Sequence, residues 1–308
     1  MDFGRPDQPS SVDWRLPPDS SLTQLTLKQL GPSKDARLYI GSTAWAQKEL
    51  VGEVYPPKTK SADYLQAYGR QFNSIELNTT YYRTPDHRQV LKWYAATPDD
   101  FRFCPKVNKA ISQRSDLGIH SSSTLDFVKA VQHFEHKLGP CFIQLPPGFD
   151  TSKADALRAW LDTWPPTARL AVELRHASWF SESAGLDLFA ELVHRGIGTV
   201  ITDVGGRRDV AHMHLTADFV VVRWVGTLHN SDRGRLTDWA KRLRSWYAAG
   251  LREAYVFTHQ PEPVPSARSA AALLSLYRSE NARPQVSSRA PVIGVQESNP
   301  PSQSELFD

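Results

Sequence analysis

The sequence has few cysteines, no long apolar run and little excess charge, and each shortage excludes a class of protein. Its two cysteines, Cys104 and Cys141, both lie in apolar runs that suit buried strands, where a free thiol behaves as a small hydrophobic group. A reducing compartment fits this better than a secreted, disulfide-bonded setting. No apolar run approaches the roughly 20 residues of a membrane span, and the first residues lack a basic segment followed by an apolar one. We therefore expect an untargeted, cytoplasmic protein.

The charge balance also limits the partners. A net charge of +3 and a pI of 8.8 are mild, so an extended electrostatic footprint on duplex DNA is not implied, although a local basic pocket is compatible with them. At 308 residues, with 40% hydrophobic and 22% charged residues, the chain suits one large domain or two small ones.

Polar, proline-bearing stretches mark both ends of the chain. Residues 1–36 are predicted to form an N-terminal extension outside the core, and residues 281–308 a disordered C-terminal tail. The folded domain is expected over residues 37–280.

Between these ends, short apolar runs alternate with segments of helical period. Strands are predicted over residues 38–42, 74–77, 102–106, 141–145, 170–174, 199–203, 219–224 and 254–258. Helices are predicted over residues 62–72, 88–95, 123–136, 155–163, 186–194, 237–249 and 267–278. Eight strands alternating with helices over about 250 residues are typical of a single (β/α)8 TIM-type barrel, and a doubly wound open sheet is the alternative. Because a polar residue ends every strand, rather than only those beside a switch point, the pattern favours closure around one shared site.

Six short segments carry a resemblance to a known family. They occur in this order: Gly41–Trp45, Ile75–Tyr82, Phe101–Lys106, Gln144–Pro147, Glu173–His176 and Val222–Gly226. The series resembles the YecE-like family, known as domain of unknown function 72. The resemblance implies a fold similar to TIM barrels and a shared site, but no reaction, because the family has no assigned biochemical role.

The chain departs from that family pattern at four places. Many members have a second Gly where this chain has Ala44, Thr-His in place of Ser112-Gln113, His-Gly in place of Val225-Gly226, and Asn-Asn in place of His259-Gln260. If those positions take part in the chemistry, this chain belongs to a branch with a different substrate.

The polar strand ends supply the candidate site. The segment from Ala171 to Trp179 carries Glu173 and Arg175, which share one face of a strand because side chains alternate. The predicted catalytic residues are Glu173, Lys106, Asp203, His176 and Glu76. The predicted substrate-binding residues are Arg175, Arg223, Asn78, Gln144, Trp45, Tyr82 and His259. Guanidinium groups grip phosphate or carboxylate in two-point fashion, and a carboxylate beside an arginine can serve as a general base.

Each of these residues also has a structural interpretation. The charged residues could pair off to compensate one another in a barrel core, and Gln144 could merely satisfy a backbone group. Trp179 and Trp224 suit core packing, whereas Trp45 and Tyr82, flanked by polar residues on loops, are favoured as pocket walls. No cofactor is required by the sequence. A divalent metal could be held by Glu76, Glu173, Asp203 and His259, although the sequence contains no local spacing of ligands that supports a metal site. His212 and His214 are interpreted as solvated loop histidines.

The tail suggests a second hypothesis. Gln303, Leu306 and Phe307 are similar to the short Gln-x-x-Leu-Phe peptides that dock on the bacterial sliding clamp, and the alternative is a Leu-Phe pair that folds back on the domain. The leading expectation is an enzyme that acts on a small anionic, phosphorylated substrate by acid/base chemistry. The alternatives are a metal-dependent phosphodiesterase or repair factor that works on DNA and is recruited through the tail, and a non-catalytic barrel that binds a ligand or partner.

Overall fold

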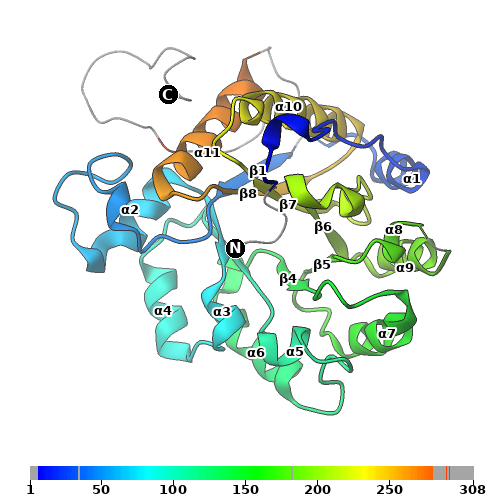
Figure 1. Cartoon of the computed structure of the whole chain (residues 1–308). Coiled ribbons are helices and arrows are strands. Elements are labelled where there is room, and N and C mark those ends of the chain that lie inside the picture. The colour runs from blue at the N-terminus through cyan, green and yellow to red at the C-terminus, as the bar shows by residue number, and fades with distance from the viewer. Residues whose placement is uncertain (1–5, 34, 182, 280–288, 290, 292–308) are drawn as a thin grey trace.

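In the described part of the chain, eight parallel strands form the centre of the molecule. Helices surround them (Figure 1). The computed structural model describes residues 6–33, 35–181, 183–279, 289 and 291. The strands are β1 (Arg37–Gly41), β2 (Ser74–Leu77), β3 (Arg102–Pro105), β4 (Cys141–Gln144), β5 (Leu170–Glu173), β6 (Gly198–Asp203), β7 (Phe219–Val225) and β8 (Glu253–His259). A six-stranded sheet runs in the order β1-β8-β7-β6-β5-β4, and β2 pairs with β3 in a second sheet. The protein is thus an α/β fold with a parallel central sheet, and all eight predicted strands are confirmed.

Isolated backbone hydrogen bonds join the two sheets. Glu76 N donates to Ser42 O (3.1 Å) between β2 and the end of β1, and Val107 N donates to Phe142 O (2.8 Å) between the end of β3 and β4. Gly41 allows the first of these contacts, because a Cβ at that position would lie 2.2 Å from Ser74 O. A side chain at position 41 would therefore force β1 and β2 apart.

The main helices follow the predicted segments and in most cases begin earlier. They are α1 (Ser21–Leu30), α2 (Tyr64–Gln71), α3 (Thr79–Tyr82), α4 (His87–Ala95), α5 (Lys109–Ser112), α6 (Ser123–Gln132), α7 (Ala154–Thr163), α8 (Ser178–Ser181), α9 (Ser183–Arg195), α10 (Ser231–Ala249) and α11 (Pro263–Arg278). Side-chain caps define some of the starts: Ser20 accepts from Thr23 N at α1, and Asp86 accepts from Gln89 N at α4. The sequence signal missed α1 and the short helices α3, α5 and α8.

The strands bury apolar side chains on both faces. A main core packs between the strands and the surrounding helices, and Cys141 belongs to it. A smaller inner cluster lies on the opposite face of the strands and consists of Tyr39, Cys104, Phe142, Ala171, Val200, Ala217, Phe219, Val221, Tyr255 and Phe257. Both cysteines are free and buried, as predicted. The alternation of strand side chains between these two faces decides which polar residues can meet.

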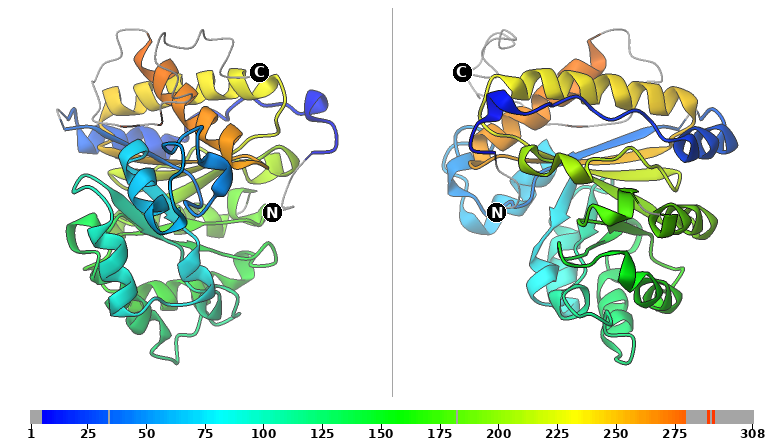
Figure 2. Two further views of the ribbon diagram at one scale, coloured as in Figure 1. Left: turned by 90° about the vertical axis from the view of Figure 1, so that its left-hand side faces the viewer. Right: turned by 45° about the vertical axis from the view of Figure 1, so that its right-hand side comes forward.

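The segment before β1 packs against the domain more closely than an extension outside the core would. Leu27 of α1 lies in the main core, the Arg235 guanidinium stacks on the Trp14 ring (4.0 Å to its centroid), and Arg242 Nη1 donates to Asp19 Oδ1 (2.7 Å). Figure 2 shows this segment running beside α10. The predicted tail, with Gln303, Leu306 and Phe307, lies outside the described residues.

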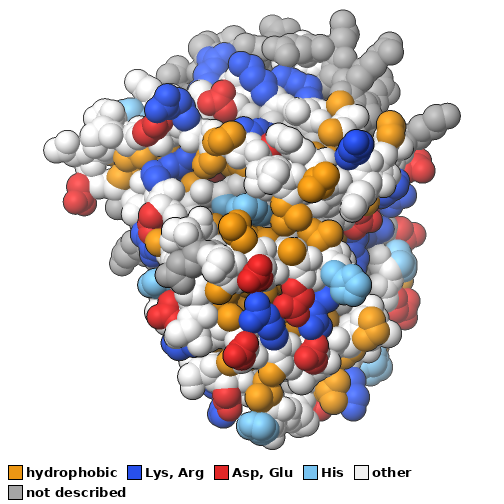
Figure 3. Space-filling model, turned by 90° about the vertical axis from the view of Figure 1, so that its right-hand side faces the viewer, with side chains coloured by type: hydrophobic (Ala, Val, Ile, Leu, Met, Phe, Trp, Pro, Cys, Tyr) orange, Lys and Arg blue, Asp and Glu red, His pale blue; other side chains and the backbone are white. Residues whose placement is uncertain are grey.

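The surface over α7 and α9 carries charges of both signs (Figure 3). Arg158 binds Asp155 and Glu191, and Arg195 binds Asp162 and Glu191. Over α7 and α9, these described charges of opposite sign therefore pair with one another. None of the helices in the described ranges is long and apolar enough to cross a membrane.

The interpretation of His212 and His214 as solvated histidines was wrong. His212 is buried, its ring stacks on Phe180 (4.9 Å between centroids), and its Nε2 lies 3.3 Å from Val200 O. His214 stacks on Phe189 at 4.1 Å. Burial, with a smaller contribution from His214, lowers the pKa of His212 to about 3. The two histidines pack β6 against α8 and α9, which the histidine pattern alone did not reveal.

The buried imidazole of His212 predicts an acid sensitivity. Because its pKa is lower in the folded than in the unfolded chain, the unfolded state binds the extra proton between about pH 6.5 and 3. His212 therefore contributes to the loss of stability as the pH falls through that window, by at most about 1.4 kcal/mol per pH unit. Urea unfolding between pH 4 and 7 should show a smaller loss for His212→Gln than for the unsubstituted protein. His194→Gln, on the exposed end of α9, is the control, and equal slopes for all three proteins would contradict the prediction.

Candidate functional site

Polar side chains line the same strand face as the inner cluster, near the carboxyl ends of the strands. Two positions beyond an inner-cluster residue, the side chain returns to the same face. The pairs are Cys104 and Lys106, Phe142 and Gln144, Ala171 and Glu173, Val200 and Thr202, Val221 and Arg223, and Phe257 and His259. The second residue of each pair is polar. These six polar residues and Glu76 of β2 form a set of seven, which we call the central network.

Arg223 holds two glutamates in the middle of this network. Its Nε and Nη2 donate to Glu76 (2.9 and 3.0 Å), and its Nη1 donates to Glu173 Oε2 (3.1 Å). All three side chains are at most 2% exposed. A buried arginine with two carboxylates compensates most of its desolvation cost only through such close contacts. Segments up to 147 residues apart in sequence are thus joined at one place.

The remaining members complete the hydrogen bonding of the two carboxylates. Lys106 Nζ donates to Gln144 Oε1 (2.8 Å), and Gln144 Nε2 donates to Glu173 Oε2 (2.8 Å). Thr202 Oγ1 donates to Glu173 Oε1 (2.9 Å). His259 Nε2 lies 3.0 Å from Glu76 Oε2, and Asn78 Nδ2 donates to Glu76 Oε1 (2.9 Å). Gln144 therefore bridges two charged side chains rather than satisfying a backbone group.

The two glutamates are held as carboxylates. Burial alone would raise the pKa of Glu76, but the charges of Arg223 and His259 outweigh burial and lower that pKa well below its usual value. Burial likewise raises the pKa of Glu173, and Arg223, Arg175 and Lys106 together lower it. Since a carboxylate with a lowered pKa and several donors is a weak proton acceptor, this environment disfavours Glu173 as a general base.

The environment of Lys106, in contrast to that of the two glutamates, favours the uncharged form of the side chain. Burial and the repulsion of Arg223 lower the pKa of Lys106 to about 8, although Glu76 and Glu173 act to raise it. The ring of Tyr81 lies over its ammonium group, with 4.3 Å between Nζ and the ring centroid. Arg175 Nε lies 3.8 Å from Glu173 Oε1, which confirms that these two share a face. Lys106, Arg175 and Arg223 outnumber the two glutamates by one positive charge before His259 is counted.

The structure places four predicted site residues away from the central network. Asp203 lies one position beyond Thr202, so its side chain points to the other face of β6, where Arg235 (3.0 Å), Arg208 and Trp239 Nε1 (2.8 Å) bind its carboxylate. His176 Nδ1 lies 2.8 Å from Ser178 Oγ at the start of α8. Trp45 packs edge-on against Trp93 of α4, at the edge of the main core. Tyr82 is 68% exposed and contacts Tyr81.

Sequence reasoning missed two residues that the structure brings to the network. Thr202 lies two positions after Val200, which marks the inner face of β6, so its side chain points to that face. Asp203 was predicted instead because of its charge. Tyr81 was not predicted as a site residue, because core packing explains an aromatic side chain near a strand end equally well. Only the turn of α3 reveals that the first of the pair covers Lys106.

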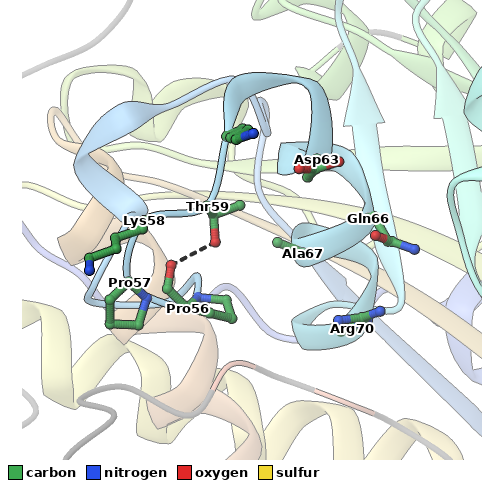
Figure 4. Close-up of a pocket in the computed structure, with 9 residues that line it drawn as sticks. Pro56, Pro57, Lys58, Thr59, Asp63, Gln66, Ala67 and Arg70 are labelled. Carbon is green, nitrogen blue, oxygen red and sulfur yellow. Dashed lines mark hydrogen bonds between the residues drawn. The ribbon is translucent and has the colours of Figure 1, made fainter.

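A cavity of about 330 Å³ lies outside the central network, between the loop 56–60 and α2 (Figure 4). Lys58, Lys60 and Arg70 line it together with Asp63, and all four side chains are exposed. Thr59 Oγ1 donates to Pro56 O (2.6 Å) and fixes the turn. Solvated cations of this kind bind anions weakly, because water screens their charges.

The acids predicted as metal ligands are bound to arginines. Glu76 and Glu173 bind Arg223, and Asp203 points to the other face of its strand. Within the described part of the chain, no group of three or more His, Cys, Asp or Glu side chains is placed to hold a metal ion.

Comparisons with known proteins agree with the resemblance seen in the sequence. The model of the family "Protein of unknown function DUF72" matches residues 39–292. The chain belongs to the DUF72 family. It is 28% identical over 245 residues to the UPF0759 protein YecE of Escherichia coli K12, which covers 73% of this chain and 87% of YecE. It is 32% identical over 151 residues to the UPF0759 protein YunF of Bacillus subtilis 168, which covers 47% of this chain and 52% of YunF.

A solved DUF72 structure shares the fold. The crystal structure of a DUF72 family protein from Enterococcus faecalis V583 superposes with a TM-score of 0.65 at 18% identity, and covers 83% of this chain and 98% of its own. At that identity the likeness concerns the fold alone. The family names carry no substrate, so any function has to be argued from the site.

Proposed function

We propose that the protein is an enzyme that acts on a small anionic, phosphorylated substrate by acid/base chemistry at the carboxyl ends of the strands. The observation that carries the proposal is Lys106, a buried lysine with a pKa near 8 that is fixed by Gln144 and covered by Tyr81. A lysine whose pKa lies near neutral pH can both bind an anion and exchange a proton with it. The excess positive charge of the site favours an anionic ligand.

The other residues have supporting roles in this proposal. Arg175, with 11% of its side chain exposed, is placed to grip an anionic group beside Lys106. Glu76 and Glu173 hold Arg223 and set the charge around Lys106, so they position the site. His259, bound to Glu76, is the second candidate for proton transfer. Asp203 has no place in the proposed chemistry.

The same proposal includes the closure of the strands into a (β/α)8 barrel. The hydrogen bonds from Glu76 to Ser42 and from Val107 to Phe142 bridge the two places where the sheets are separate. The inner cluster contains residues from seven of the eight strands, as expected when strands surround a common axis. In such barrels the carboxyl ends of the strands hold the active site.

Binding of phosphorylated compounds tests the function. We expect inorganic phosphate or a member of a panel of sugar and nucleotide monophosphates to bind, as measured by calorimetry, and Lys106→Met to weaken that binding at least about tenfold. Lys109→Met, on the exposed surface of α5, is the matched control. If turnover of a panel member is found, the rate should fall as the pH rises through about 8 when Lys106 acts as the acid. Equal affinities of the Lys106→Met and Lys109→Met variants would refute the proposal.

A further inference from the structure

Residues 6–20, which we call the N-terminal strap, contact the segment that follows β6. This segment is the short 3₁₀ helix η6 (Gly205–Val210). A Cβ at Gly205 would lie 2.5 Å from Trp14 Cη2 and 2.7 Å from Pro6 Cγ. The two rings of the strap therefore fit against Gly205 only because it has no side chain. The DUF72 match begins at residue 39, so these contacts come from a part of the chain that the family pattern does not describe.

The indole of Trp14 is held from several sides. Its Nε1 donates to Pro9 O (2.9 Å) within the strap. The buried guanidinium of Arg235 lies 4.0 Å from the ring centroid, and the guanidinium of Arg208 lies 5.9 Å from it. A desolvated guanidinium over an indole face is one of the stronger cation–π contacts. These contacts fix the orientation of the ring, with its Cη2 edge against Gly205.

Two consecutive arginines of η6 connect the strap with the candidate site. Arg208 Nη2 donates to Arg15 O (2.9 Å) in the strap. Arg207 Nη2 donates to Arg175 O (2.9 Å), just after the carboxyl end of β5. Asp209 orients the Arg207 guanidinium, because its carboxylate accepts from Nε (2.8 Å) and Nη2 (2.9 Å). The strap and the backbone of Arg175 are thus joined through η6.

The backbone at Arg207 allows these neighbouring side chains to reach different partners. Its φ of −140° and ψ of 56° are not helical, so η6 bends at this residue. Only Gly206 separates Arg207 from Gly205. A displacement of Gly205 would therefore be passed to Arg207 and to the carbonyl group that it binds.

We propose that the N-terminal strap positions Arg175 for the anionic ligand, with Trp14 and Pro6 pressing on Gly205 and Arg207 holding the backbone of Arg175. The proposal rests on the anion-binding role proposed for Arg175. Binding groups act only when they are placed to within about 0.5 Å, so a loosened backbone at Arg175 weakens its grip. Trp14 is a positioning residue in this proposal, because it acts through η6. A segment that precedes the family domain thereby sets the affinity of the family site.

Gly205→Ala tests the strap in the full chain without any ligand. The added methyl group would meet Trp14 and Pro6 first, and Gly205 has no positive φ that alanine would strain. We expect hydrogen exchange over residues 205–210 and 174–177 to become at least about fivefold faster. Gly234→Ala is the matched control, because a Cβ there meets no atom within 4 Å. It should leave the exchange in both segments unchanged.

Trp14→Ala probes the same contact from the other side, and covers the case in which Gly205→Ala does not fold. It should accelerate exchange in the same two segments, whereas Trp14→Phe, which keeps an aromatic face for Arg235, should accelerate it less. Because Gly205→Ala acts partly through the indole, its effect should be smaller when it is added to Trp14→Ala than in the unsubstituted protein.

Phosphate calorimetry on the same variants measures the consequence for the site. Gly205→Ala and Trp14→Ala should each weaken phosphate binding about fivefold, and Gly234→Ala should not. Faster exchange confined to the strap and residues 205–210, with residues 174–177 unchanged, would overturn the proposal. Unchanged phosphate affinity in both variants would overturn it as well. If the unsubstituted protein binds no phosphorylated compound, the proposed function fails, and exchange over residues 174–177 still decides whether the strap holds Arg175.

Discussion

Replacing Arg223 by methionine is expected to destabilise the protein by about 3–5 kcal/mol. Glu76 and Glu173, both at most 1% exposed, would then lie close together without the cation that binds both. Burial and mutual repulsion would raise their pKa values above those of the unfolded chain. The folded variant would bind more protons than the unfolded chain at a pH between the unfolded and the folded pKa values of these glutamates. Its stability should therefore decrease as the pH rises from the unfolded to the folded values. Urea unfolding at pH 5 and pH 8 measures both effects.

Two sets of variants serve as controls for Arg223→Met. Arg114 forms an exposed ion pair with Asp116, so Arg114→Met should cost less than about 1 kcal/mol. Adding Glu76→Gln and Glu173→Gln to Arg223→Met should recover part of the loss, because it removes the uncompensated charges. If Arg223→Met lowered the free energy of unfolding no more than Arg114→Met, the idea that Arg223 stabilises the buried charges of Glu76 and Glu173 would be contradicted.

Asp203→Ala is expected to lower stability by about 3 kcal/mol and to leave phosphate binding unchanged. Asp203 accepts hydrogen bonds from Trp239 and Arg235 on the side of β6 that faces α10. Arg235 keeps Asp232 as a partner, which places the cost at the lower end of that for breaking a buried pair. The measurements are urea unfolding and phosphate calorimetry.

Thr202→Val is the matched variant on the opposite face of the same strand. It removes one hydrogen bond to Glu173, so we expect a loss of about 1 kcal/mol together with a change in phosphate affinity. If Asp203→Ala instead abolished phosphate binding at unchanged stability, Asp203 would belong to the binding site. That result would contradict the conclusion that Thr202, and not Asp203, faces the central network.

The sequence was sufficient to predict the strands, because apolar runs of four to seven residues ending in a polar residue are a strong local signal. It also predicted that Glu173 and Arg175 share a face, since that follows from alternation within a single strand. Which face of a strand carries the inner cluster, in contrast, is decided by the tertiary structure. Asp203 and Thr202 show the difference: both end the same apolar run, and only the phase set by Val200 separates them.

Other features depended on contacts that no local pattern encodes. His212 and His214 lie in a segment that contains many polar residues. Even so, their rings are covered by Phe180, 32 positions before His212, and by Phe189, 25 positions before His214. The pairing of Glu76 with Arg223 joins residues 147 positions apart. Charge and residue type indicated that these groups could meet, whereas their mutual distances required the fold.

The central network joins residues of six different strands and Lys106, which follows β3, and this limits how the protein can move. Sliding any one of these strands past its neighbours would break a buried hydrogen bond to a charged group, at a cost of about 1.5–3 kcal/mol. Motions that admit a ligand should therefore be confined to the connecting segments, such as α3 with Tyr81 and Tyr82. In hydrogen exchange, the strands would then open only with global unfolding, while the backbone around α3 would exchange through local opening. Access to Lys106 would be governed by the displacement of a single aromatic turn.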